Sequence, residues 1–386
     1  MKNKLTFQQA LLRYMKRNKR KTEKQAILVA FLLMIVLIVS GLTSNNFIKK
    51  TEPMPVTAEG DAITLGFTGD MMLGRFVEKT VDRYDPSVIF LGTGIDLTSL
   101  DYLSGNFEHP IINDAIELEN KEREKIYLAA NENVLDIIKS AGFTNINLAN
   151  NHMYDYGEDG ILYTIEQFNK AGIPFVGAGQ NRSEAYQIHY EEINDIRIAT
   201  LGFTEVYTRA ALTGIETPGV ATSNIKIMLN KIEEAKKYAD VVITHIHWGT
   251  EYKTKFDKRQ EQIAEVLAEA GVDIIIGHHP HVLQAIDRID DTIVFYSLGN
   301  FVFDQGWSMT RETVFPIVTI DKDGGVSVEL NPMLIKEGIP HQLKKSERYY
   351  KKRIFNRLKR NSTLDFTEED GKLYFKTQLK SETSEQ

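Results

Sequence analysis

The sequence predicts an α/β protein with a central β-sheet (sandwich) flanked by helices and preceded by a single N-terminal transmembrane helix. Three observations support this fold class. Short apolar runs alternate with amphipathic helical patterns along most of the chain. Residues 26–43 form an apolar span without charge or proline. Two further apolar runs near the C-terminus flank a turn rich in Asp and Gly, which is typical of a β-hairpin.

Composition places the chain among globular proteins and restricts its chemistry. It has 386 residues, 42% of them hydrophobic, and no cysteine. This length and apolar content exclude a disordered or fibrous protein. The absence of cysteine excludes disulfides, zinc–thiolate sites and thiol nucleophiles. A metal site in this chain must therefore use His, Asp, Glu and Asn.

The N-terminal region has the charge pattern of a membrane anchor. Residues 1–25 carry nine Lys or Arg side chains and one acid, and they are predicted to form a basic cytoplasmic tip. The span 26–43 is predicted to be an uncleaved transmembrane anchor, with a cleaved signal peptide and a buried core helix as the weaker alternatives. Residues 44–60 are polar and are expected to form a stalk. The prediction is a single-pass protein of the cell membrane with a cytoplasmic N-terminus and an extracytoplasmic body.

The body is predicted to alternate strands and helices. Seven apolar runs are expected to be strands: Ile63–Phe67, Thr144–Leu148, Pro174–Val176, Ile196–Gly202, Val241–Ile246, Asp273–Ile276 and Thr292–Ser297. Four helical patterns lie between them: Asn131–Ala141, Asp159–Ala171, Asn224–Tyr238 and Asp257–Ala270. Three of these helices are followed by a glycine, as a left-handed C-terminal cap requires: Gly142, Gly172 and Gly271. A hairpin is predicted from Val314–Ile320 and Val326–Asn331, and Gly371–Thr377 is expected to add a terminal strand.

The last part of the chain, residues 336–386, is predicted to be a basic tail that follows a body of residues 61–335. Residues 344–360 contain nine Lys or Arg side chains and one acid. Two interpretations are open: a solvated basic helix, or a patch that binds an anionic polymer or lipid headgroups rather than nucleic acid. The residues expected to bind polymer are Lys351, Lys352, Arg353 and Arg357.

Side chains that can hold a metal or transfer a proton follow the predicted strands. In open α/β sheets, ligands bind beyond the carboxyl ends of the strands. The residues at these positions are Asp70, Asn106, Glu108, Asn151, His152, His245, His247, His278, His279 and His281. Each alone has an ordinary structural explanation, such as a helix cap or a surface histidine. Together they include six of the 9 histidines and predict a site for one or two divalent ions, Mn, Zn or Fe.

The order of these motifs resembles a known family. The motifs are Gly69-Asp70, Gly105-Asn106-Phe107-Glu108, Asn150-Asn151-His152, His247-Trp248-Gly249, Gly277-His278-His279-Pro280-His281 and the block from Tyr296 to Asp304 that contains Asn300. They resemble the capsule-synthesis CapA/PgsA family, which is similar to the calcineurin-like metallophosphoesterases. The resemblance covers roughly residues 60–335. It implies a metallophosphoesterase-like fold and a role in poly-γ-glutamate synthesis and export, beside membrane subunits of a synthesis complex.

The resemblance also implies roles for individual residues. The implied metal ligands are Asp70, Glu108, Asn151, His247, His279 and His281. Glu108 would bridge two ions, with Asn106 as a less favoured alternative, and His278 competes with His279 as a ligand. His152 would be the general acid beside the leaving oxygen. The residues expected to complete the pocket are Asn106, His245, His278 and Asn300.

Two departures from the phosphoesterase pattern leave two functions open. The first motif reads Asp70-Met71-Met72 instead of Asp-x-His, and Gly105-Asn106 stands where the phosphoesterases have Gly-Asp. The loss of one imidazole and one carboxylate weakens the first metal site. The chain is therefore expected to be either a metal-dependent hydrolase acting on a phosphoester or amide of an envelope polymer, or a non-catalytic subunit that assists synthesis or export.

Overall fold

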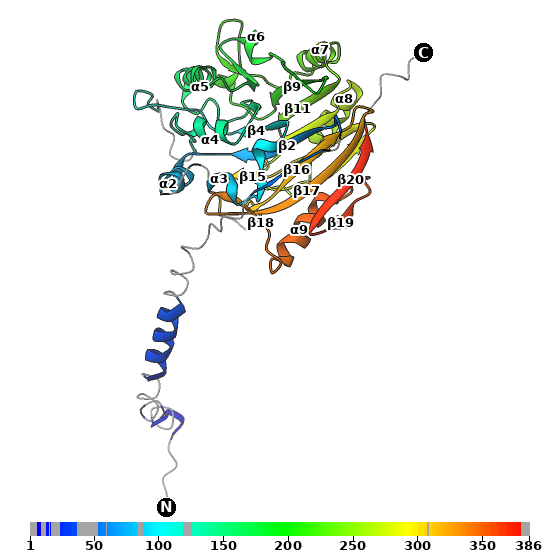
Figure 1. Ribbon diagram of the computed structural model, residues 1–386. Coiled ribbons are helices and arrows are strands. Elements are labelled where there is room, and N and C mark those ends of the chain that lie inside the picture. Colours follow the sequence, from blue (N-terminus) through cyan, green and yellow to red (C-terminus); the bar gives the residue numbers. More distant parts are fainter. Residues whose placement is uncertain are drawn as a thin grey trace, which may run out of the picture. The chain divides into compact units, whose positions relative to one another are not determined.

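The computed structural model describes residues 6–8, 13, 14, 16, 24–36, 53–58, 60–83, 86, 88–118, 126–306 and 309–379. The chain divides into two units, residues 1–50 and residues 51–386. In the first unit, residues 24–36 are helical. All elements named below belong to the second unit, which carries the predicted site (Figure 1).

The prediction of a single-pass membrane protein is contradicted. No helix in the described part of the chain is long and apolar enough to cross a membrane. Residues 37–43 of the expected anchor and 44–52 of the expected stalk lie outside the described residues, as does most of the expected basic tip.

Within the described residues, two mixed sheets form the second unit. The larger sheet has the order β19 (Thr367–Glu369), β20 (Lys372–Gln378), β17 (Gly325–Lys336), β16 (Glu312–Ile320), β2 (Ile63–Met71), β4 (Tyr102–Phe107), β5 (Asn145–Asn147) and β6 (Phe175–Val176). Two short strands extend it: β15 (Asn300–Val302) pairs with β2, and β18 (Ile339–Gln342) pairs with β17. Strands β2, β4, β5 and β6 are parallel, whereas β16, β17 and β20 are antiparallel.

The smaller sheet lies against the larger one. Its order is β13 (Ile286–Ile289), β14 (Thr292–Phe295), β12 (Ile274–His278), β11 (Val241–His247), β9 (Ile196–Thr204) and β8 (His189–Ile193). Its central strands β9, β11, β12 and β14 are parallel. Two strand pairs stand apart: β1 (Met54–Pro55) with β3 (Ile95–Asp96), and β7 (Ala178–Gly179) with β10 (Gly219–Val220).

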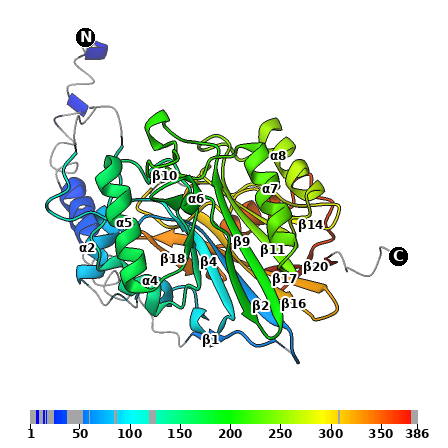
Figure 2. The same cartoon turned by 90° about the horizontal axis from the view of Figure 1, so that it is seen from above.

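Helices cover the outer faces of both sheets, except for the C-terminal helix, whose apolar residues pack in the cluster between the sheets. They are α2 (Arg75–Arg83), α3 (Val88–Leu91), α4 (Val134–Ser140), α5 (Gly157–Ala171), α6 (Arg182–Ala185), α7 (Ile225–Lys236), α8 (Lys258–Glu269) and α9 (Arg348–Leu358). Short 3-10 turns form at Leu97–Ser99 and Arg209–Ala211. Figure 2 shows α4 and α5 on one side of the strands and α7 and α8 on the other. The predicted α/β sandwich with flanking helices is therefore observed.

The core between the sheets explains why both sheets contain nearly continuous apolar runs. Ile63, Leu65 and Phe67 of β2 pack in one buried cluster with Ile274 and Ile276 of β12. The intervening residue of β12 faces the opposite way, into the layer that α7 and α8 cover. Alternation places successive side chains on opposite faces, so a strand covered on both faces is apolar throughout.

The structure changes two details of the predicted organisation. The Tyr102–Phe107 segment, which is not among the seven expected strands, is strand β4, because its polar middle residues are held in the sheet between β2 and β5. The expected boundary between residues 335 and 336 falls inside β17. Beyond it, β18 and β20 join the larger sheet, so residues 336–379 belong to the folded unit.

Helix α9 is fastened to the sheet by its arginines. Its apolar residues Ile354, Phe355 and Leu358 lie in the core between the sheets. Arg353 and Arg357 both form ion pairs with Glu312 of β16, whose side chain is fully buried. Four residues were expected to bind polymer. Two of them, Arg353 and Arg357, instead have their guanidinium groups engaged by Glu312 of the protein itself. Lys351 forms an ion pair with Glu368 at 3.1 Å, and Lys352 is exposed.

We expect Arg357→Met to lower the free energy of unfolding by about 3 kcal/mol, since breaking a buried ion pair leaves an incompletely compensated charge. Urea denaturation followed by circular dichroism measures this change. The control is Lys352→Met on the same helix, whose exposed side chain should change stability by less than about 0.5 kcal/mol. Equal effects of the two substitutions would contradict a structural role for the pair.

Candidate metal centre

The larger sheet brings three polar residues together at one edge, which is formed by the carboxyl ends of its parallel strands. Asp70 lies in β2, where its neighbours across the sheet are Asn106 of β4 and Asn300 of β15. Asn106 Nδ2 donates a hydrogen bond to Asp70 Oδ1 at 2.9 Å. Gly69 permits the close contact with the segment before β15, because a Cβ atom there would lie 1.9 Å from the carbonyl oxygen of Gly299. The sheet thus holds Asp70 in a fixed position.

The smaller sheet brings histidines to the same edge. His247 at the end of β11 is the register partner of His278 at the end of β12. His279 and His281 follow in the loop after β12, with φ angles of 93° and 56°. Left-handed backbone is uncommon for residues other than glycine, and such positions concentrate at functional sites. The loop is thereby bent back toward β2, and the backbone N–H of His279 donates to Asp70 Oδ2 at 3.2 Å.

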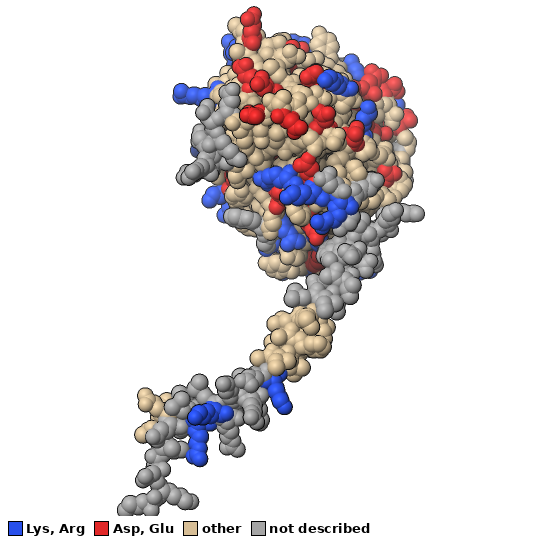
Figure 3. All heavy atoms as spheres, turned by 90° about the vertical axis from the view of Figure 1, so that its left-hand side faces the viewer, with Lys and Arg blue, Asp and Glu red and all other residues tan. Residues whose placement is uncertain are grey.

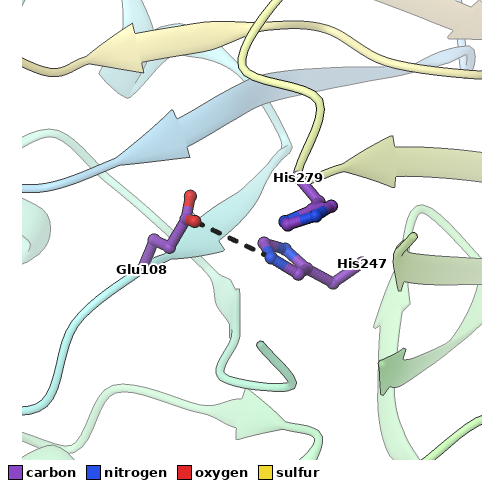
Figure 4. Close-up of side chains that lie close together, drawn as sticks. All are labelled: Glu108, His247 and His279. Carbon is purple, nitrogen blue, oxygen red and sulfur yellow. Dashed lines mark ion pairs between the residues drawn. The ribbon is translucent and has the colours of Figure 1, made fainter. Parts of the chain in front are cut away.

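The carboxylate of Glu108 is the distinctive feature of this edge. Its side chain is fully buried, and neither of its oxygens has a hydrogen-bond partner among the described residues. Oε1 lies 3.7 Å from His247 Nε2 and 3.6 Å from His281 Nε2. Figure 4 shows Glu108 facing His247, with His279 beside it. A buried carboxylate without partners is costly to the fold unless a cation compensates it.

Asparagine side chains orient His247. Asn151 Oδ1 lies 2.7 Å from His247 Nε2, and Asn106 Nδ2 lies 3.3 Å from His247 Nδ1. The side-chain oxygen of Asn106 accepts hydrogen bonds from Asn147 and Asn150. Both ends of the Asn106 amide are therefore engaged within the protein. This arrangement favours Glu108 over Asn106 as a bridging ligand.

His278 and His279 face different partners. His278 Nε2 lies 3.0 Å from His245 Nδ1, the two rings are stacked, and His278 Nδ1 lies 3.3 Å from Asp70 Oδ1. His279 Nδ1 is buried without a hydrogen-bond partner among the described atoms, and its ring centroid is 4.8 Å from that of His247. The geometry therefore favours His279 as the ligand beside Glu108 and places His278 between Asp70 and His245.

His281 stands between the two carboxylates. Its Nδ1 lies 2.8 Å from Asn300 Oδ1 and 3.4 Å from Asp70 Oδ2, and its Nε2 faces Glu108. Asn300 is fixed in turn by donating to Gln305 Oε1 and to the carbonyl of Thr310. A metal-binding histidine commonly donates its other ring N–H to an oxygen acceptor in this way.

Burial and neighbouring charges set the protonation of the cluster. Burial holds the pKa of His247 well below its usual value and lowers that of His279 to about 3, so both rings are neutral at pH 7 and can offer a lone pair. Burial also lowers the pKa of His245. Burial raises the pKa of Glu108 well above its usual range, and the charge of Asp70 raises it further. Burial alone would raise the pKa of Asp70, but His278 and His281 hold it low.

The remaining predicted residues lie around this cluster. His152 is half-buried, and its Nδ1 lies 2.7 Å from Asp155 Oδ2. His245 is fully buried and its Nε2 contacts the hydroxyl of Ser104 at 2.9 Å, so it supports His278 from behind. The structure thus brings all ten predicted metal, general-acid and pocket residues of the sheet edges, together with Asn300, to one region.

Two residues of the site were not identified in the sequence. Glu251 is exposed and offers a carboxylate near His279 and His281. Asp155 orients His152. Each carried a usable signal: Glu251 follows the His-Trp-Gly motif by two residues, and Asp155 lies three residues after a histidine. Isolated acids near a motif are too common for this signal to stand without the structure.

Three groups of side chains could hold a metal ion, each with ligand atoms within 4.8 Å of one another: Glu108, His247 and His279; Asp70, Glu108 and His281; and Glu251, His279 and His281. Two ligands of one tetrahedral ion at about 2.1 Å lie about 3.4 Å apart, close to the separations around Glu108. Carboxylate with neutral imidazole suits Zn, Mn or Fe. Glu108 belongs to two groups, as a bridging ligand would.

Comparison with known proteins assigns the chain to a family. Residues 64–305 match the family described as "Bacterial capsule synthesis protein PGA_cap". The chain belongs to this family. It is 38% identical to the capsule biosynthesis protein CapA of Bacillus anthracis, over 97% of this chain and 92% of that protein. It is also 38% identical to the PGA biosynthesis protein CapA of Bacillus subtilis, over 97% of each chain. The resemblance indicated by the motifs is confirmed.

Solved structures overlap this chain more loosely. The alignment with the calcineurin-like phosphoesterase YfkN from Bacillus subtilis covers 73% of this chain and 88% of that chain, with a TM-score of 0.35 and 13% sequence identity. The alignment with a 5'-nucleotidase precursor from Thermus thermophilus covers 76% of this chain and 59% of that chain, with a TM-score of 0.39 and 12% sequence identity.

We expect Glu108→Gln to stabilise the metal-free protein and to remove its stabilisation by metal. Because the pKa of Glu108 is raised in the fold, its ionisation destabilises the folded state once the pH exceeds the usual value of about 4.3. The stability difference between variant and wild type should therefore be small near pH 4 and grow toward neutral pH. Thermal unfolding in chelator at several pH values, then with added Mn or Zn, measures both effects.

The matched control is Glu158→Gln, which neutralises an exposed carboxylate on α5. It should respond to pH and metal as the wild type does. A Glu108→Gln protein that gains as much stability from metal as the wild type would show that the ion binds elsewhere.

Proposed function

We propose that this protein takes part in poly-γ-glutamate capsule synthesis through a buried centre that binds one or two divalent metal ions. The observation that carries the proposal is the Glu108 carboxylate, which is fully buried, lacks hydrogen-bond partners among the described residues and faces two imidazoles. The relatives named as capsule and PGA biosynthesis proteins cover nearly the whole chain, which supports the pathway.

Two sets of residues would hold the ions. Glu108, His247 and His279 form one set, with Asn151 completing it, and Asp70 with His281 forms the other and shares Glu108. When bound, a divalent ion supplies Lewis acidity and lowers the pKa of a coordinated water. The neutral rings of His247 and His279 keep their lone pairs available at pH 7, as the low pKa values of these residues require.

His152 has the contacts of a proton donor beside this centre. Asp155 accepts from its Nδ1 at 2.7 Å, which leaves Nε2 as the atom that holds or releases a proton. The His152 side chain is 14% exposed, so it can reach a substrate that enters from solvent. In the hydrolase form of the proposal, His152 protonates the leaving oxygen or nitrogen of an envelope polymer or its precursor.

A non-catalytic role is the second candidate, and the surroundings of Asp70 favour it. Met72 stands where phosphoesterases have a histidine, and it packs with Leu128 and Phe303 in a small apolar cluster. Asn106 replaces a carboxylate and holds Asp70 by a neutral amide. Such a centre would bind one ion tightly and the other weakly. The protein would then assist the proteins that make or export the polymer without turning over a substrate.

We expect the purified protein to retain one tightly bound ion, with a second bound more weakly, after saturation with Mn or Zn and dialysis. His279→Ala and His281→Ala should each lower the metal content, because each removes an imidazole from two of the ligand groups. Elemental analysis measures this, and His189→Ala on β8 is the control. If the wild type retains no metal, the centre is not a metal site.

Replacement of His152 separates the two candidate functions. In a poly-γ-glutamate-producing host whose only copy of this protein is the variant, His152→Asn should keep metal bound and reduce polymer output, since a general acid contributes about 10²–10⁴-fold to a rate. Glu108→Gln should lose metal and output together. Normal output from the His152→Asn strain, with normal metal content, would instead establish the non-catalytic role.

A further inference from the structure

A basic groove lies outside the metal centre, between α9 and the larger sheet. Its volume is about 370 Å³, within the range of about 300–1,000 Å³ found for ligand sites. The charged residues that line it are Lys344, Lys345, Arg348, Lys351, Lys372 and Asp370. Five cations therefore face the groove against one acid, although the whole chain has a net charge of -7.

Part of this positive charge is not compensated by the protein. Lys351 is paired with Glu368 and Lys372 with Glu329, at 3.1 Å and 2.7 Å. Lys344, Lys345 and Arg348 are exposed, and none of the three side chains forms an ion pair with another described residue. The nearby acid Glu347 is already engaged, because Lys336 Nζ lies 2.8 Å from its Oε1 and the backbone N–H of Lys344 donates to its Oε2.

The groove is built on a rigid frame. The buried Glu312 fixes α9 through Arg353 and Arg357, and Glu347 fixes the start of the helix through Lys336. On the opposite wall, β17 and β20 are paired in the sheet. A fixed frame lowers the conformational entropy lost when a ligand binds, so the exposed cations are arranged before the ligand arrives.

We propose that this groove binds a stretch of a polycarboxylate chain, the polymer of the pathway in which we place the protein. The proposal rests on the proposed function for the identity of the polymer. Several cations in one concave site match carboxylates that repeat along a chain, while Pro332 and Leu343 in the lining can contact the methylene groups between them. A flexible chain can enter a groove of this shape, whereas a flat lipid surface meets only its rim.

The charge distribution of the body restricts binding of a polyanion to areas where basic side chains predominate. On the face drawn in Figure 3, acidic side chains predominate in the upper part of the body and basic side chains cluster below them, with some side chains of the opposite sign in each area. A polyanion is repelled by the net negative charge of the protein and attracted only where cations predominate. Because exposed charges are screened within about 10 Å at 0.1 M salt, binding should weaken steeply as salt rises.

The test uses the full chain in chelator, so that metal binding plays no part. Fluorescently labelled poly-γ-glutamate is titrated with wild type and with the triple variant Lys344→Gln, Lys345→Gln and Arg348→Gln. We expect the triple variant to bind at least about tenfold more weakly and with a smaller dependence on salt. Free glutamate at the same carboxylate concentration should compete poorly, because binding of a chain gains from several linked contacts.

The matched control is the triple variant Lys226→Gln, Lys258→Gln and Arg182→Gln, which removes the same charge from exposed sites on α7, α8 and α6. It should bind like the wild type, and thermal unfolding should show both variants folded. Equal losses in the two variants, or no binding by the wild type, would overturn the proposal. Binding of vesicles of phosphatidylglycerol and phosphatidylcholine through the groove, without binding of the polymer, would also overturn it.

The outcome is separable from that of the proposed function. His279→Ala should bind the polymer as the wild type does, because its ring lies in the buried cluster and not in the groove. If the wild type binds metal normally but does not bind the polymer, the proposal for the groove is refuted and the proposed metal centre is not affected. If the wild type binds the polymer but retains no metal, the proposed metal centre is refuted and the proposal for the groove stands.

Discussion

The apolar layer between the two sheets is the constraint on which the site depends. Residues such as Phe67 of β2 and Ile276 of β12 pack face to face, and this packing fixes where the two sets of parallel strands end. The loop that carries Glu108 and the loop that carries His279 belong to different sheets. They meet only because the layer between them is filled. Repacking of this layer would therefore disturb the metal centre without touching any of its ligands.

Electrostatics then gives the meeting point its chemistry. Fully buried carboxylates at Asp70 and Glu108 would repel each other if both were ionised, and the structure resolves this in two ways. Asp70 receives hydrogen bonds from Asn106 and from the backbone of His279. Glu108 receives none from the described residues, so its charge is left for a ligand to compensate. The asymmetry separates a residue fixed by the fold from one available to an ion.

A buried carboxylate also determines how the C-terminal helix α9 presents its charges. Arg353 and Arg357 look like surface cations in the sequence, yet their guanidinium groups are drawn inward by the buried Glu312. Their inward position leaves five exposed cations in the run: Lys344, Lys345, Arg348, Lys352 and Lys359. Which members of a basic run face solvent is decided by one acid on a strand far away in the chain. A charge count over the run cannot separate the two groups.

The sequence by itself determined the alternation of strands and helices, because apolar periodicity and helix-ending glycines are local signals. Gly142, Gly172 and Gly271 all have positive φ, as their positions after helices predict. The same signals could not identify β4, whose Ser, Gly and Asn residues are buried by neighbouring strands, nor support the membrane location, which the described helices contradict. Only the tertiary structure decided that His279 rather than His278 faces Glu108 and that Glu251 joins the cluster, because those relations depend on distances between loops from different sheets.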